Sequence, residues 1–160
     1  MDCFTLFYFK FLKSQPTDEH FWTNQINTPL VNTWMGLAFE RVCMEHIEQI
    51  KVKLGISGVL TEVNSWYCKA DLDNGVFGSQ IDMLIVRKDQ VINLCEMKYS
   101  QSEYTITEKV DRNIRNKIND LITVSGTKYA IYPTIITTYG LVENSYSQEV
   151  QSVVTMDDLF

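Results

Sequence analysis

Proline, glycine and long apolar runs are scarce in this chain of 160 residues, which contains three prolines and seven glycines. That composition excludes collagen-like and low-complexity sequences. No stretch approaches the roughly 18 uninterrupted apolar residues of a membrane helix. The apolar start, Met1 to Lys13, lacks both the basic first residues and the small-residue cleavage site of a secretory signal. We therefore expect a compact globular protein of the cytoplasm that has no membrane partner.

Paired cysteines, phosphate-binding loops and an excess of positive charge are also missing. The four cysteines are far apart and form no CxxC pair, which favours free thiols in a reducing compartment. Neither GxGxxG nor GxxxxGK[ST] occurs, so this chain alone should not bind ATP. Fourteen Lys and Arg against 20 Asp and Glu give a net charge of −6. Any contact with nucleic acid would need metal ions, a local basic patch or another domain.

The first 33 residues differ in pattern from the rest. Phe4, Phe7 and Phe11 stand at helical spacing, although Phe7, Phe9 and Phe11 would also suit a strand, and we favour the helix. This arm is expected to pack either on the domain's own core or on a neighbour absent from this chain. Residues 14–33 are polar and read as a connecting segment with one short turn. We therefore divide the chain into an N-terminal arm and connecting segment, 1–33, and a domain, 34–160.

Hydrophobic periodicity predicts an α/β domain in which a mixed sheet contains an antiparallel hairpin. Pro133 suggests that its strand lies at an edge or carries a bulge. The predicted elements are a helix over 34–54, a strand over 59–66, a polar loop over 68–78, a hairpin of strands 80–87 and 91–99, a helix over 108–124, a strand over 129–138 and a short strand over 150–155.

One acidic residue interrupts the apolar stripe of the 34–54 helix. Glu40 stands three residues after Leu37 and seven before Ile47, so the 3.6-residue period places its carboxylate among core-facing side chains. A carboxylate that faces a core needs a partner. The sequence therefore marks Glu40 as a candidate site residue.

Two more carboxylates should meet on the hairpin. If Arg87 lies opposite Val91, Asp82 lies opposite Glu96. Gln80 and Lys98 would then share their face. Like charges on neighbouring strands destabilise a sheet unless a cation lies between them, and here that cation is Lys98 or a divalent metal. Oxygen ligands on rigid strands suit Mg²⁺ or Mn²⁺.

These residues resemble the PD-(D/E)XK nuclease signature, with Glu40 on a helix, Asp82 on a strand and Glu96-Met97-Lys98 on the paired strand. The segment Ser79-Gln80-Ile81-Asp82 lacks the proline of that name. In more detail, the chain resembles the C-terminal domain of a group of prokaryotic AAA-type ATPases. The segments that carry this likeness are Gly36-Leu37-Ala38-Phe39-Glu40, Ser79-Gln80-Ile81-Asp82, Cys95-Glu96-Met97-Lys98-Tyr99-Ser100 and Ile136-Thr137-Thr138-Tyr139-Gly140-Leu141.

The resemblance implies a restriction-endonuclease-like core with the order helix-strand-strand-strand-helix-strand. Asp82, Glu96 and the main-chain carbonyl of Met97 would bind Mg²⁺ or Mn²⁺, and Glu40 would complete the metal shell. Lys98 would orient the attacking water or stabilise charge on phosphorus. Gln80 would position a ligand.

The later helix offers further cations for this chemistry. Lys117, Arg112 and Arg115 could touch phosphates, although a solvated helix face is the more ordinary interpretation.

The function that follows is metal-dependent hydrolysis of DNA phosphodiesters by a module attached to an ATPase in the same or a neighbouring chain. Nucleases of this type often dimerise, and the aromatic arm is a candidate surface for a homodimer. One alternative is an inactive nuclease-fold module that docks a partner or regulates an ATPase, which the acidic balance favours. Another is a structural ion cluster, in which side chains neutralise Asp82 and Glu96 and leave no cleft.

Overall fold

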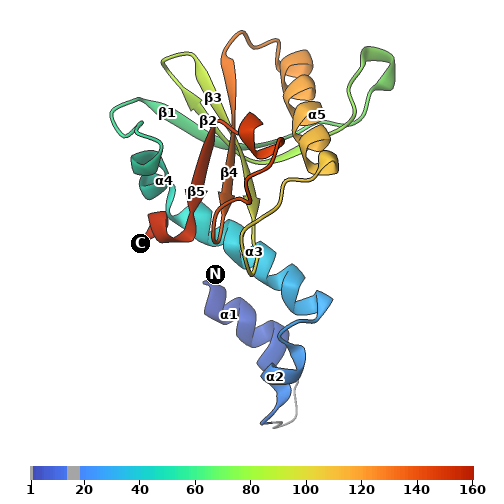
Figure 1. Ribbon diagram of the computed structural model, residues 1–160, viewed down its shortest axis with the longest axis vertical. Coiled ribbons are helices and arrows are strands. Elements are labelled where there is room, and N and C mark those ends of the chain that lie inside the picture. The colour runs from blue at the N-terminus through green and yellow to red at the C-terminus, as the bar shows by residue number, and fades with distance from the viewer. Residues whose placement is uncertain (1, 14–18) are drawn as a thin grey trace.

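The computed structural model describes residues 2–13 and 19–160, which form a mixed five-stranded sheet with helices on both faces (Figure 1). The α/β class is confirmed. No helix of the described residues is long and apolar enough to cross a lipid bilayer. In chain order the main elements are α1 (Cys3–Phe7), α2 (Phe21–Gln25), α3 (Pro29–Glu45), α4 (Ile47–Lys53), β1 (Thr61–Tyr67), β2 (Gln80–Arg87), β3 (Val91–Lys98), α5 (Glu108–Ser125), β4 (Ala130–Thr137) and β5 (Ser152–Thr155).

The strands lie in the order β1-β2-β3-β4-β5, antiparallel from β1 to β3 and parallel from β3 to β5. The prediction that Pro133 marks an edge strand is wrong, because β4 lies between β3 and β5. Proline is tolerated there because β5 pairing begins only at the next residue, Thr134, opposite Ser152. The missing N–H of Pro133 therefore removes no bond of the β4–β5 ladder.

The first long helix differs from its prediction at both ends. It begins at Pro29 instead of residue 34, because the Thr28 hydroxyl accepts the Val31 N–H and proline suits the first helical position. It is interrupted at His46, whose backbone leaves the helical region with φ −115° and ψ 31°. The predicted single helix is thus two helices, α3 and α4. The boundary drawn after residue 33 falls inside α3.

The N-terminal arm is helical, as its spacing predicted. It consists of α1 followed by a π-helical turn at Tyr8–Leu12. Phe7 and Phe11 contact Trp22 and Trp34 with ring centroids 5.2–6.1 Å apart. These four residues are the aromatic cluster, and Phe11 is 2% exposed. The arm therefore packs on α2 and the first turns of α3. Part of the predicted connecting segment, residues 14–18, lies outside the described residues.

Apolar packing fills both sides of the sheet. On one side Phe39 and Cys43 of α3 and Ile50 of α4 pack on the sheet. On the other side Leu121 of α5 packs on Leu94 and its neighbours. Figure 1 shows α3 and α5 on opposite faces. We call these the α3 side and the α5 side.

A buried carboxylate fastens the loop between β1 and β2 to the α5 side. Asp120 of α5 is fully buried and accepts hydrogen bonds from the Phe77 N–H at 2.9 Å and the Ser79 hydroxyl at 2.5 Å. The Cys68 thiol lies 3.8 Å from the same carboxylate. The loop predicted over 68–78 is therefore anchored, and it delivers β2 to the sheet just before Gln80.

Candidate functional site

The hairpin register is confirmed over four residue pairs, from Met83 opposite Cys95 to Val86 opposite Ile92. The ladder ends there, so Asp82 does not pair with Glu96 as predicted. The β1–β2 register shifts at this point, since Asn64 lies opposite Leu84 but Trp66 lies opposite Ile81. A shift of this kind is a β-bulge, and it reorients the neighbouring side chains.

The bulge changes which way Asp82 points. Ile81 and Leu84 belong to the same apolar group on the α5 side, although simple alternation would place them on opposite faces. Asp82, with Gln80 and Met97, instead borders a cavity on the α3 side. Glu96 borders a different cavity on the α5 side. The prediction that Asp82 and Glu96 share one face is therefore wrong.

Lys98 nevertheless connects the two carboxylates. Its Nζ lies 3.2 Å from Oε2 of Glu96 and 3.9 Å from Oδ2 of Asp82. Burial opposes the charge on this ammonium, but the Glu96 and Asp82 carboxylates outweigh it and raise the pKa of Lys98 above its usual value. Lys98 is therefore a protonated cation near neutral pH.

Glu96 has a second lysine partner. Its side chain is 5% exposed, and its Oε1 lies 2.5 Å from Nζ of Lys117 on α5. The interpretation of Lys117 as part of a solvated helix face is wrong, because its side chain is only 13% exposed. The other oxygen of Glu96 pairs with Lys98. Each oxygen of this buried carboxylate thus has its own ammonium, as burial of a charge requires.

Asp82 is held differently. Its Oδ2 accepts the backbone N–H of Met97 at 3.1 Å. This bond fixes the start of β2 against the end of β3, so that Met97 and Lys98 lie beside the carboxylate. Just beyond β3, the Ser100 N–H donates to the Thr138 hydroxyl at 3.1 Å and ties the end of this strand to that of β4.

Glu40 lies on α3 and borders the same cavity as Asp82. It is half-buried, and no ion pair or hydrogen bond joins its carboxylate to another of the described residues. Burial and the neighbouring Asp82 carboxylate raise the pKa of Glu40, with a smaller contribution from Glu96. The expected core-facing stripe is corrected here, because Leu37 is 61% exposed and Phe39 takes the core position.

Two cavities therefore meet the same end of the hairpin. The α3-side cavity has a volume of about 890 Å³ and lies between α1, α3 and the ends of β2 and β3. Phe9, Trp34 and Leu37 give it apolar walls, and Lys10 and Arg41 add charge. The α5-side cavity has a volume of about 300 Å³ and is bordered by Glu96, Lys98 and a row of polar residues on α5.

The chemical type of the ligand atoms at this site suits a hard divalent cation. Asp82, Glu96 and the Met97 carbonyl offer oxygen ligands, which Mg²⁺ and Mn²⁺ prefer. Burial is the main cause of the raised pKa of Glu40, and a bound cation would offset the second cause, the neighbouring Asp82 carboxylate. Among the described residues, however, no three His, Cys, Asp or Glu side chains gather closely enough to form a metal cluster. A cation would have to replace the lysines now paired with Glu96.

Sequence reasoning missed three residues near this site. Lys109 and Asn113 border the α5-side cavity beside Lys117, and their spacing of four residues on a helix was the available signal. Tyr104 is half-buried, and burial raises the pKa of its hydroxyl, while the charge of Lys98 opposes that rise. No local pattern places Tyr104 there, because it belongs to the irregular segment before α5.

One comparison with known proteins gives a match. The model of the DUF234 family, described as archaea bacterial proteins of unknown function, matches residues 7–114. Those residues include the arm, α3 and the whole hairpin. No curated protein and no solved structure matches the chain.

Proposed function

This chain belongs to the DUF234 family of archaeal and bacterial proteins of unknown function, and we propose that it hydrolyses phosphodiester bonds of DNA with the help of a divalent metal. The observation that carries this proposal is the position of the Lys98 ammonium between the Asp82 and Glu96 carboxylates at the open end of the hairpin. Asp82, Glu96 and Lys98 follow the PD-(D/E)XK pattern in sequence. Lys98 lies within ion-pair distance of both carboxylates.

Asp82, Glu96 and the Met97 carbonyl would hold Mg²⁺ or Mn²⁺. The bound cation would polarise the phosphodiester and lower the pKa of a bound water molecule. Glu40 would face the cation from α3. The N–H of Met97 keeps Asp82 beside β3.

Lys98 would stabilise the negative charge that develops on the phosphate oxygens as water adds and the P–O bond breaks. Its raised pKa supports this role over that of a base, because a protonated ammonium cannot accept the proton of water. Gln80 lies beside Asp82 on the cavity wall, where its amide would orient the substrate.

The test is a calorimetric titration of Mn²⁺ into the purified protein, followed by plasmid nicking on the same samples. We expect the wild type to bind Mn²⁺ and nick DNA. Asp82→Asn and Glu96→Gln should abolish binding and reduce nicking about 100-fold or more, since each removes charge at the reacting centre. Glu62→Gln, which removes an exposed carboxylate of β1, is the matched control and should behave as the wild type.

If the wild type does not bind Mn²⁺ at millimolar metal, the proposal that the chain is a nuclease is wrong. Nicking that survives in both variants would also overturn it, because a contaminating enzyme would then be responsible. Circular dichroism of each variant must match the wild type before the comparison is made.

The second candidate is an inactive nuclease-fold module that docks or regulates an AAA-type ATPase in the same or a neighbouring chain. The pairing of Glu96 with Lys98 and Lys117 favours it, because those lysines occupy the metal ligand. Exposed apolar residues on α1 and α3, such as Phe4 and Leu37, offer contact surface for such a partner or for a second copy of the chain. Under this function the carboxylate variants would leave partner binding unchanged.

A further inference from the structure

The α5-side cavity is bordered by a regular row of polar side chains. Lys109, Asn113 and Lys117 follow one another at intervals of four residues, which places them one above another on a helix. Val110 and Ile114 form the apolar border of the row. The row leads from the start of α5 to Glu96, whose carboxylate Lys117 contacts.

This cavity concentrates positive charge in an acidic protein. Three lysines and a single carboxylate, Glu96, border it, whereas the chain as a whole carries a net charge of −6. Lys98 and Lys117 share that one carboxylate. Within residues 2–13 and 19–160, no carboxylate lies within ion-pair distance of Lys109. The local positive charge is therefore not balanced by the acids of the cavity.

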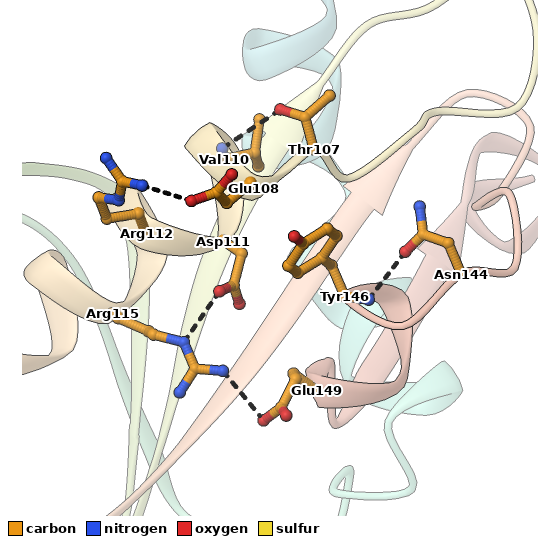
Figure 2. A network of polar contacts seen from close by, with 9 residues as sticks. All are labelled: Thr107, Glu108, Val110, Asp111, Arg112, Arg115, Asn144, Tyr146 and Glu149. Atoms are coloured by element: carbon orange, nitrogen blue, oxygen red, sulfur yellow. Dashed lines mark hydrogen bonds and ion pairs between the residues drawn. The ribbon is translucent and has the colours of Figure 1, made fainter.

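The arginines of the same helix differ from Lys109, because each has a carboxylate partner. Figure 2 shows Arg112 paired with Glu108 and Arg115 held between Asp111 and Glu149. Each guanidinium on that part of α5 thus has an acidic partner. Lys109 and Lys117 therefore border the cavity, whereas Arg112 and Arg115 pair with carboxylates outside it.

We propose that the α5-side cavity binds a phosphate group of a DNA strand next to the phosphodiester that is cut. This inference rests on the proposed hydrolysis of DNA and names the surface that receives the strand. Lysine ammonium groups bind phosphate as point charges, and the Asn113 amide supplies a neutral donor. The cavity, with a volume of about 300 Å³, would receive one backbone phosphate, while the rest of the duplex stays outside it. Lys98 lies on the boundary between this cavity and Asp82, so the two phosphates would be adjacent along one strand.

The experiment measures DNA binding without catalysis. A fluorescein-labelled duplex oligonucleotide is titrated with the full chain in EDTA, and anisotropy is recorded from 50 to 200 mM salt. Lys109→Gln should weaken binding about five- to tenfold near 0.1 M salt and reduce the salt slope by about one, as loss of one phosphate contact predicts. Arg112→Gln removes one positive charge from the same helix outside the cavity, and we expect affinity within twofold of the wild type.

Equal losses in the two variants would overturn the proposal, because affinity would then follow net charge instead of the cavity. An unchanged salt slope in Lys109→Gln, or no measurable binding by the wild type, would overturn it as well. Lys109 is exposed, so its substitution should leave the fold intact, which thermal unfolding checks.

A competition experiment distinguishes binding of a phosphate in a DNA strand from binding of free inorganic phosphate. Unlabelled oligonucleotide should displace the probe at concentrations near its own Kd. Inorganic phosphate should fail to do so at about 10 mM, because it makes only one of the phosphate contacts of a strand. Displacement by inorganic phosphate alone would reassign the cavity to a small anion and overturn the strand assignment. Because no metal is present, failure of the nicking experiment would leave this result unaffected.

Discussion

The two sides of the sheet treat the same kind of charge differently. On the α3 side, Asp82 and Glu40 border a large cavity with apolar walls, and the Glu40 carboxylate has no ion-pair partner among the described residues. On the α5 side, Glu96 is nearly buried and each of its oxygens contacts a lysine. Lys98 stands between the two environments. Asp82 and Glu96 belong to one sequence signature, yet they lie in different electrostatic environments because the β-bulge changes the direction of the Asp82 side chain.

The largest expected effect tests whether apolar packing holds the α3 side. Phe39→Ala should lower the free energy of unfolding by about 3–5 kcal/mol, because the ring is 2% exposed and its loss leaves a cavity beneath α3. Leu37→Ala on the same helix is the control, and we expect less than about 1 kcal/mol because that side chain is 61% exposed. Urea unfolding followed by circular dichroism measures both. Equal losses would show that α3 is not anchored through Phe39.

A smaller effect is expected from the polar fastening of the α5 side. Asp120→Ala should lower the free energy of unfolding by about 2 kcal/mol, since it leaves the partly buried Phe77 N–H and Ser79 hydroxyl without their acceptor. Asn119→Ala removes only an exposed bond to the Gly75 carbonyl and should cost about 0.5 kcal/mol. The same urea experiment applies. A cost for Asp120→Ala no larger than that of its neighbour would mean that water replaces the carboxylate.

The smallest effect is a pH dependence that belongs to the α3 side. Because the pKa of Glu40 is raised above its ordinary 4.5 in the folded protein, the folded state keeps a proton that the unfolded chain has released. The free energy of unfolding therefore falls as pH rises from 4.5 through the folded pKa. Glu40→Gln should remove this fall, so the variant is more stable than the wild type at pH 7 and equal to it near pH 4.

Thermal unfolding across that pH range measures the effect. Glu48→Gln removes an exposed carboxylate of α4 and controls for net charge, since its side chain is 76% exposed. If the difference in stability between the wild type and Glu40→Gln is the same at every pH, the pH dependence does not come from Glu40.

Much of the hairpin could be predicted because its cause is local. A three-residue turn and the two-residue period of a strand define the register, and the pairs from Met83 to Val86 follow it. The same reasoning failed at Asp82, because the bulge arises from pairing with β1, whose partners no short pattern reveals. The start of α3 failed for a local reason. The cap formed by Thr28 and Pro29 was missed because the polar residues Asn32 and Thr33 interrupt the apolar pattern before Trp34.

The sequence by itself determined the α/β class and the helical arm, and it singled out the residues of the proposed site, because periodicity and residue type act within one element. Only the tertiary structure decided which of those residues meet. Lys117 reaches Glu96 across 21 positions, and Asp120 reaches Phe77 across 43. Such contacts depend on how α5 packs on the sheet, and that packing is the sum of many weak apolar interactions. The sequence therefore showed which side chains are charged, but not the environment of each charge.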